Sequence, residues 1–292
     1  MESFGWRTVI INHHAKLSLS CSNLKITQDD HSDMIPLSQI KVIMINTDEA
    51  SVTSALMSKL NSYNVKTIFC DEKHLPCCEV CGYSNNVKSA GNQLEQIMWS
   101  EEKKQEVWTK IVRLKIHLQY KVLMMNHIKN ADILSNAASE VTLKNAVFQE
   151  ASAARIYFSM LFGNNFSRRS PSDINSALNY GYSIILSSVS RSIVLHGYLT
   201  SLGINHHSQT NPFNLSCDIM EPFRPFVDNH VFRNPTKKLN WDYKKELIEL
   251  SIFTVKYKNK KMELQTAVDL FVNDVLLELN GEKNKIGEID FI

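Results

Sequence analysis

The 292-residue sequence contains few of the residues that interrupt regular structure. It has only 9 glycines and 7 prolines, which argues against long disordered tracts. No run of 18 apolar residues occurs, so we expect no segment that spans a membrane. Residues 1–12 lack the basic start and apolar run of a secretory signal. Together with only six cysteines, this predicts a cytoplasmic protein with reduced thiols.

The chain also lacks a strong net charge. Its formal charge is +2 at pH 7, with 43% hydrophobic and 21% charged residues, as in ordinary globular proteins. A nearly neutral chain supplies no attractive field, so binding of a nucleic acid would have to depend on local clusters of positive charge. The length suffices for one large domain or two ordinary domains.

A compact cysteine cluster lies in the stretch HLPCCEVCGY. Cys78 and Cys81 form a CxxC pair, and Cys77 and His74 are close by. A structural zinc site usually needs a second ligand pair at a suitable spacing, and the next cysteine downstream is Cys217. We therefore favour ordinary thiols near a β-hairpin over a zinc site.

The first ~85 residues are rich in short β-favouring runs. In KLSLSC, apolar and polar residues alternate, which is the period of a half-buried strand. The turn-rich piece TQDDHSD separates two of the runs, and a short helix is expected over 51–63. The predicted strands are WRTVIIN (6–12), KLSLSC (16–21), NLKIT (23–27), QIKVIMIN (39–46) and VKTIFCD (65–71).

From about residue 92 the apolar period changes from 2 to 3.6, which is typical of amphipathic helices. Apolar stripes at helical spacing run through 94–116, 173–200 and 264–279. The second stripe includes Gly181, a small residue that would let another helix approach closely. We expect Gly203 to end this helix.

The polar stretch YSNNVKSAGNQ at 83–93 separates the two patterns, and no internal repeat is visible. The sequence therefore predicts an α+β fold. A small N-terminal β-rich domain over residues 1–85 is followed by a larger all-α domain over residues 86–292. If the chain is an enzyme, we expect the chemistry to lie in the larger domain, where the candidate groups are found.

One carboxylate stands on an otherwise apolar helical face. In VFQEASAARIYFSMLFG, helical spacing aligns Glu150 with Ala154, Tyr157 and Leu161. Burial of an unpaired carboxylate costs on the order of several kcal/mol, so Glu150 needs a cation or a proton. On this segment alone, we favour an ion pair with an arginine, either Arg155 or one from another helix.

The segment GINHHSQTNPFNLSCDIMEPFRP (203–225) combines imidazoles, carboxylates and three stiffening prolines. His206 and His207 are adjacent. Asp218 and Glu221 are three residues apart, so in a helical turn their carboxylates lean to the same side. Rigidly placed carboxylates and an imidazole suit Mg²⁺ or Mn²⁺ more than a closed zinc site. An exposed loop with solvated charges is equally compatible with this segment alone.

Three ordered motifs resemble those of a known family. They are ExxAARxYFxxLFG (150–163), DINxALNYGYxxL (173–186) and LGINH…DIMEPFRP (202–225). Together they resemble the CRISPR-associated integrase, which inserts new spacers into a CRISPR array. The resemblance covers nearly the full length and looks closest to the type II branch, whose arrays work with one large RNA-guided nuclease. It implies a small N-terminal β domain joined to a helical catalytic domain.

The resemblance implies a metal-dependent DNA endonuclease and integrase. By their places in the motifs, Glu150, His206 and Glu221 correspond to the family's catalytic metal ligands for Mg²⁺ or Mn²⁺. Asp218 matches an additional acidic position that assists the metal or orients a ligand, and His207 flanks the site. The implied reaction is a transesterification, in which the 3′-hydroxyl of a short DNA fragment attacks a phosphodiester at the end of the CRISPR repeat.

The resemblance also implies partners. The family forms homodimers, and two dimers flank a dimer of a small second adaptation protein in a hetero-hexamer that holds double-stranded DNA with 3′ overhangs. In the type II branch, the large effector nuclease and a ring-forming accessory protein also take part. No membrane is involved.

Candidate DNA contacts come from local positive charge. The clusters are also compatible with a solvated face, and Arg155 and Arg224 with an ion pair that neutralises a ligand carboxylate. The candidates are Arg155, Arg168, Arg169, Arg224, Lys237, Lys238, Lys244, Lys245 and the run KYKNKK (256–261).

Two other functions remain compatible with the sequence. A chain of the same architecture could be a non-catalytic DNA-binding scaffold, although the intact Glu/His/Glu set argues against this. A metal-dependent hydrolase of small phosphoesters would need no extended basic surface leading to Glu150.

Overall fold

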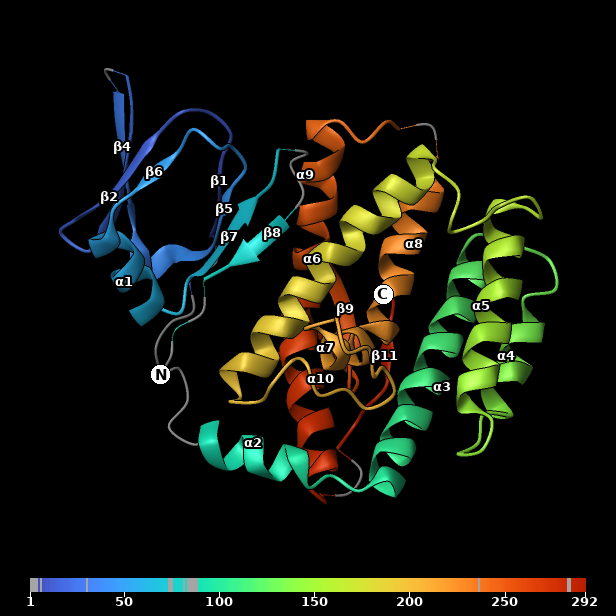
Figure 1. The fold of residues 1–292 in the computed structure, drawn as a ribbon. Coiled ribbons are helices and arrows are strands. Elements are labelled where there is room, and N and C mark those ends of the chain that lie inside the picture. Colours follow the sequence, from blue (N-terminus) through green and yellow to red (C-terminus); the bar gives the residue numbers. More distant parts are fainter. Residues whose placement is uncertain are drawn as a thin grey trace. The chain divides into compact units, whose positions relative to one another are not determined.

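A computed structural model of the chain describes residues 5, 7–29, 31–72, 76–80, 82, 89–235, 237–282 and 285–292. The chain divides into two compact units, Met1–Ser84 and Asn85–Ile292 (Figure 1). The first unit is rich in strands and the second is mostly helical, which confirms the predicted fold class. Among the described helices, none has an apolar stretch of the length needed to cross a bilayer.

The N-terminal unit contains two four-stranded sheets and one described helix. The first sheet has the order β1 (Arg7–Ile11), β5 (Ile40–Ile45), β7 (Lys66–Cys70) and β8 (Pro76–Glu79). The second has the order β4 (His31–Pro36), β3 (Asn23–Gln28), β2 (Lys16–Ser20) and β6 (Ser51–Val52). Helix α1 (Ser54–Ser62) begins after Thr53, whose side chain accepts a hydrogen bond from the Leu56 backbone N–H.

Apolar side chains of β2 and β3 contribute to the core of this unit. Leu17 and Leu24 are fully buried and pack with residues of β1, β5 and α1 in one apolar cluster. The predicted turn TQDDHSD is mostly strand, because β3 and β4 stay paired up to Gln28 and His31. Asp29 adopts a positive φ of 45° directly after the strand, so the chain reverses within fewer residues than the polar sequence suggested.

The cysteine cluster lies where β8 pairs antiparallel with β7, as expected for thiols near a hairpin. Cys77 and Cys78 are exposed on β8. His74 and Cys81 lie outside the described residues. The Cys77 thiol lies 3.4 Å from the Phe69 carbonyl oxygen, to which it donates a weak hydrogen bond.

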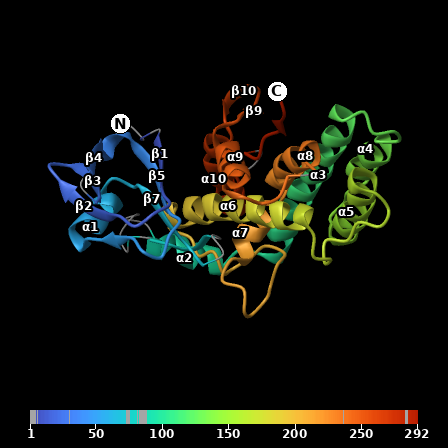
Figure 2. The same ribbon diagram turned by 90° about the horizontal axis from the view of Figure 1, so that it is seen from above.

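Nine described helices form the frame of the C-terminal unit, and α3 lies at its centre. Figures 1 and 2 both show α3 between the α4–α5 pair and α8, and α3 packs against all three. The helices are α2 (Ser89–Ile97), α3 (Glu101–Met125), α4 (Asp132–Ser139), α5 (Ala146–Phe162), α6 (Asp173–Leu195), α7 (Asn214–Ile219), α8 (Arg224–Arg233), α9 (Trp241–Glu249) and α10 (Leu264–Leu279).

Helix ends follow local side chains. Ser100 and Ser172 cap α3 and α6 by accepting hydrogen bonds from backbone N–H groups in the first turn. Helix α6 ends near Gly197, whose φ of 82° is a left-handed conformation, and not at Gly203 as predicted. The chain therefore leaves α6 earlier, and Gly203 belongs to the loop that follows.

The C-terminal unit also contains a small sheet of three strands, in the order β10 (Lys260–Glu263), β9 (Thr254–Tyr257) and β11 (Ile289–Asp290). Lys258 and Asn259 have positive φ values of 47° and 62°, as in a two-residue hairpin turn. The prediction of an all-α domain needs correction here. The run KYKNKK, interpreted only as a charge cluster, is a β-hairpin that packs its apolar side on α10.

The three predicted helical stripes have different outcomes. The stripes in α6 and α10 are buried, and those two helices pack against each other. In the first stripe, Leu94 and Ile97 on α2 are 66% and 63% exposed. The prediction of one continuous apolar stripe is wrong for α2, because the helix is interrupted at Trp99–Ser100 and α2 and α3 are separate helices.

Gly181 lies where α6 approaches α8 most closely, because a Cβ atom there would overlap Cγ1 of the buried Val227. We expect Gly181→Ala to lower the free energy of unfolding by about 1–3 kcal/mol, since the stiff valine cannot move aside. Gly91→Ala on α2 is the matched control, because a Cβ atom added there would meet no heavy atom within 4 Å beyond its chain neighbours and its own helix backbone. It should be neutral or stabilising. Urea unfolding of the full chain measures both, and equal effects would contradict the packing.

Candidate active site

A buried lysine joins the two predicted glutamate ligands. Lys115 on α3 forms ion pairs through Nζ with Glu150 on α5 and with Glu221 Oε2, the latter at 2.5 Å. The side chains of Lys115 and Glu221 are 7% and 6% exposed, and that of Glu150 is 26% exposed. The cation that we expected beside Glu150 is therefore present, but the prediction of an arginine was wrong.

Electrostatic interactions keep the side chains of Lys115 and Glu221 ionised. Burial lowers the pKa of Lys115, but Glu221 and Glu150 raise it by more, so the net shift is upward. Burial likewise raises the pKa of Glu221, but Arg224 and Lys115 hold it below its usual range. The buried carboxylate and the ammonium each stay ionised because of the other.

The backbone around Glu221 is set by proline. Pro222 disfavours helical geometry at the preceding residue, and Glu221–Phe223 form a 3₁₀ turn between α7 and α8. Arg224 then opens α8, and its Nε lies 2.9 Å from Glu221 Oε1. Glu221 is therefore held by Arg224 through one oxygen and by Lys115 through the other.

Asp218 organises the loop that carries the histidine. Its side chain, on α7, is fully buried and accepts hydrogen bonds from the backbone N–H groups of Ile204 at 2.6 Å, Asn205 at 3.0 Å and His206 at 3.1 Å. The Nδ1 of His206 lies 2.6 Å from Asp218 Oδ1, and this hydrogen bond raises the pKa of His206. Asp218 fixes the imidazole and leaves Nε2 directed away from it.

Gly203 lies beside Asp218 and His206, where only a residue without a side chain fits. A Cβ atom at Gly203 would overlap the carbonyl oxygen of His206 and lie 2.9 Å from Asp218 Oδ2. His206 also makes an edge contact with Trp108 of α3, with 6.2 Å between ring centroids. The neighbouring His207 is exposed. The structure therefore separates the two adjacent histidines into one that is anchored and one that is not.

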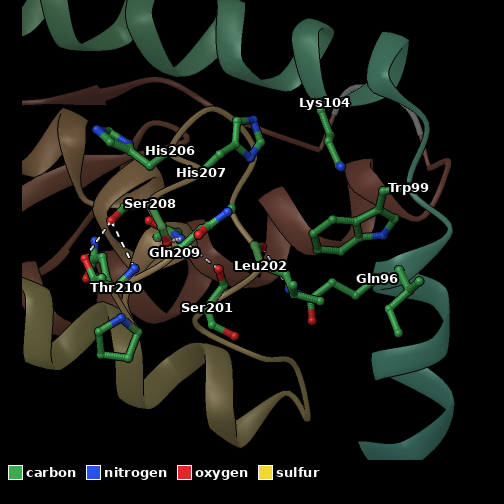
Figure 3. A pocket seen from close by; sticks show the side chains of 15 residues that line it. Gln96, Trp99, Lys104, Ser201, Leu202, His206, His207, Ser208, Gln209 and Thr210 are labelled. Atoms are coloured by element: carbon green, nitrogen blue, oxygen red, sulfur yellow. Dashed lines mark hydrogen bonds between the residues drawn. The ribbon is translucent and has the colours of Figure 1, made fainter.

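An open pocket of ≈ 690 Å³ lies beside His206 (Figure 3). Its walls come from the end of α2, the start of α3 and the loop between α6 and α7. In Figure 3, Lys104 extends from α3 toward the loop that carries His206 and His207, and Trp99 and Gln96 stand at the other side. The pocket offers space, aromatic surface and positive charge next to one of the candidate ligands, His206.

The donor set fits a hard divalent cation. Glu150 and Glu221 converge on one positive charge, and His206 is close enough to Glu221 for each to shift the pKa of the other. Within the residues that the structure describes, no three such side chains are grouped closely enough to hold a metal ion. The Lys115 ammonium contacts both carboxylates in this structure.

A second buried network supports Arg224. Its guanidinium lies 4.6 Å from the ring centroid of Tyr182, and the Tyr182 hydroxyl donates a hydrogen bond to the buried Asp228. Burial raises the pKa of Asp228 to about 6, although Tyr182, Tyr157 and Arg224 act in the opposite direction. Tyr182 is therefore used in the packing of this buried network.

The predicted DNA contacts fall into two groups. Arg168 bonds Asn175 and Asn179, and Lys244 is buried over the ring of Tyr180, so these two and Arg224 make intramolecular contacts within the unit. Lys237 is exposed but forms an ion pair with Glu246. The other exposed candidates are Arg155, Arg169, Lys238 and Lys245.

Lys115 was missed by the sequence interpretation. It continues the buried stripe of α3 that runs through Trp108, Ile111 and Val112. A lysine at a core position of a helical stripe is a signal, because lysine is almost never fully buried unless it is paired. That signal indicates a carboxylate partner but does not say where along the chain the partner lies.

The fold and this site define a class of protein: a small β-rich unit followed by a helical unit in which two glutamates contact one buried lysine and a histidine lies near one of them. The family model of CRISPR associated protein Cas1 matches residues 8–247, and the chain belongs to this family. A curated relative, the CRISPR-associated endonuclease Cas1 of Neisseria meningitidis serogroup C, is 33% identical over 295 residues. The match covers 97% of this chain and 96% of the relative.

Two solved structures share the fold. A casposase bound to its integration product superposes with a TM-score of 0.78 at 17% identity, and the match covers 96% of this chain and 92% of the casposase. A Cas6-RT-Cas1–Cas2 complex gives a TM-score of 0.73 at 18% identity, covering 98% of this chain and 36% of that chain. At these identities the likeness concerns the fold alone.

Asp218→Asn tests the anchoring of the histidine loop. An amide offers only one acceptor oxygen, and its nitrogen would face backbone donors, so we expect a loss of about 3 kcal/mol of stability. The pKa of His206 should fall, because the carboxylate that raises it is lost. Urea unfolding and histidine NMR titration measure the two effects. The exposed Asp132→Asn is the control and should change neither; an unchanged His206 pKa in Asp218→Asn would contradict the assignment.

Asp228 should make stability depend on pH. Its folded pKa of about 6 exceeds the ordinary 3.8, so the folded state retains the proton longer and stability falls as pH rises from ~4 to ~6. Above this window, ionisation of the buried Asp228 lowers the free energy of unfolding by about 3 kcal/mol. Asp228→Asn removes the titration, and the difference between wild-type and variant stability should change across this window in urea unfolding. A difference that is constant from pH 4 to pH 7 would contradict the shift.

Proposed function

We propose that the chain is a metal-dependent DNA integrase of CRISPR adaptation, with associated endonuclease activity. Membership of the Cas1 family, and the name endonuclease of the curated relative, support the general activity. The observation that carries the detailed proposal is the convergence of Glu150 and Glu221 on one cation, with the anchored His206 beside them.

The proposed reaction joins the 3′-OH ends of short DNA fragments, the prespacers, to the ends of a CRISPR repeat. A new bond forms between the fragment's 3′ oxygen and the phosphorus of the 5′-phosphate at the end of the repeat, and the bond from that phosphorus to the 3′ oxygen of the flanking nucleotide breaks. The proton of the attacking hydroxyl is transferred overall to the departing 3′ oxygen. The reaction therefore needs neither an oxidant nor a covalent protein intermediate. In the endonuclease reaction, water takes the place of the hydroxyl.

Glu150, Glu221 and the Nε2 of His206 are the groups that would hold Mg²⁺ or Mn²⁺. When bound, such an ion polarises the phosphoryl group and stabilises the departing oxygen. The remaining residues position these ligands. Asp218 holds the His206 ring, and Arg224 holds Glu221 in the 3₁₀ turn. The pocket beside His206 would receive the DNA strand next to the reacting phosphate.

The proposed assembly is a homodimer that joins a small second adaptation protein in a hetero-hexamer on double-stranded DNA with 3′ overhangs. Of the two solved structures with this fold, one is a complex that includes Cas2 and the other is a casposase bound to its integration product. The type II effector nuclease and a ring-forming accessory protein are further proposed partners. The exposed Arg155, Arg169, Lys238 and Lys245 are the residues proposed to contact DNA phosphates.

The two adjacent histidines provide a matched test of this function. His206→Ala should reduce strand transfer into a repeat-containing plasmid by at least about 100-fold, because it removes a metal ligand. His207→Ala should retain near wild-type activity, since the carboxylate of Asp218 holds the ring of His206 and not that of His207. The assay contains Mn²⁺ or Mg²⁺, the small partner protein and a fragment with 3′ overhangs.

Glu150→Ala should lose activity to a similar degree, with the exposed Glu140→Ala as its control. Wild-type strand transfer by Glu150→Ala would overturn the proposed role of that residue. If His206→Ala left strand transfer intact but abolished DNA binding, the protein would be a scaffold and not the catalyst.

A further inference from the structure

One charged contact in the candidate active site is used by none of the steps above. The ammonium of Lys115 lies between Glu150 and Glu221 and makes an ion pair with each. Both partners lie on elements that pack against α3, which carries the lysine. The lysine therefore contacts the same two carboxylates that are proposed to bind the metal.

We propose that Lys115 is an internal counter-ion that holds Glu150 and Glu221 together before a divalent cation binds, and that gives up this position to the cation. This inference rests on the proposed function, because it takes the two glutamates as metal ligands. It assigns to Lys115 a positioning role in that site, and direct contact with the reacting phosphate forms no part of it.

The two cations compete because they use the same oxygens. Nζ of Lys115 is 2.5 Å from Glu221 Oε2 and also contacts Glu150 Oε1. A divalent ion bound to both carboxylates would place two further positive charges beside the ammonium, where Lys115 and Glu221 are almost fully buried and Glu150 is partly buried. Repulsion at such short range is strong in a medium of low dielectric constant. Occupation by one cation therefore opposes occupation by the other.

The carboxylates are less able to move than the lysine. Glu221 is fixed by Arg224 at 2.9 Å and by the 3₁₀ turn that carries it. Glu150 lies in the first half of a 17-residue helix that packs along α3. Lys115, in contrast, has a flexible unbranched stem that can turn its charge toward another position. The lysine is therefore the group that leaves when the metal arrives.

A counter-ion of this kind keeps two like charges together at the expense of metal affinity. Without Lys115, the metal-free protein would hold two carboxylates near one another with less compensation, and it should be less stable. A divalent cation would then bind without displacing another charge. We expect Lys115→Met to bind Mn²⁺ at least about tenfold more tightly than wild type, which corresponds to about 1.4 kcal/mol.

The test is calorimetric titration of the full chain with MnCl₂ in the absence of DNA, together with thermal unfolding with and without Mn²⁺. The expected result is tighter Mn²⁺ binding by Lys115→Met, a lower Tm without metal and a larger rise in Tm when Mn²⁺ is added. Lys115→Arg keeps the charge and should not tighten binding. Lys110→Met is the matched control. Lys110 lies on the same helix, but its Nζ pairs with Oε2 of Glu278, at a distance of 2.7 Å, and not with Glu150 or Glu221. It should bind Mn²⁺ as wild type does.

The double variant Glu150→Gln, Glu221→Gln separates this inference from the proposed function. If that variant binds Mn²⁺ as well as wild type, the two glutamates are not ligands and the proposed function fails. If it loses Mn²⁺ binding but Lys115→Met binds no more tightly than wild type, the proposed function stands and the counter-ion role is overturned.

A second measurement uses the wild-type protein alone, in case Lys115→Met does not fold. Amine-selective labelling followed by mass spectrometry reports how accessible each lysine is. Lys115 is 7% exposed and paired on two sides, so it should react slowly without metal and several-fold faster in saturating Mn²⁺. Lys110 serves as the internal reference. An equal labelling rate of Lys115 in both conditions would overturn the inference.

Discussion

The two ion pairs of Lys115 are the contacts on which the geometry of the active site depends. They connect α3 to α5 and to the turn between α7 and α8, three segments that are distant in sequence. Charges buried in this way stabilise a protein only when each is matched, and loss of one partner leaves the others uncompensated. The site therefore depends on charge balance as much as on packing, and the helical unit has to be folded before the acidic groups meet.

Some contacts in this site join residues that are close in sequence, and others depend on packing between distant segments. Asp218 and His206, and likewise Glu221 and Arg224, are close in sequence, so one loop and one turn are enough to set their geometry. Glu150, in contrast, reaches the group only through the packing of α5 on α3. The network of Arg224, Tyr182 and Asp228 then ties the turn to α6, whose close approach to α8 depends on Gly181.

This division explains what the sequence could predict. The change of apolar period separated the strand-rich part from the helical part. The motifs singled out Glu150, His206 and Glu221, of which the two glutamates contact Lys115 and His206 lies near Glu221. The partner of Glu150 was not predictable, because no local pattern shows which side chain of another helix will face it. The hairpin over 254–263 was missed since its basic residues concealed a turn that requires positive φ at two positions.

The anchoring of His206 has a consequence for how a ligand can be accommodated beside it. One carboxylate receives four hydrogen-bond donors from three consecutive residues, so that wall of the cavity cannot adjust without losing all four bonds together. The residues that follow on the same loop, Ser208, Gln209 and Thr210, also line this pocket but are exposed, and Ser208 and Thr210 make only weak polar contacts with each other. If ligands differ in shape, we expect these residues to adjust while the imidazole of His206 keeps its position.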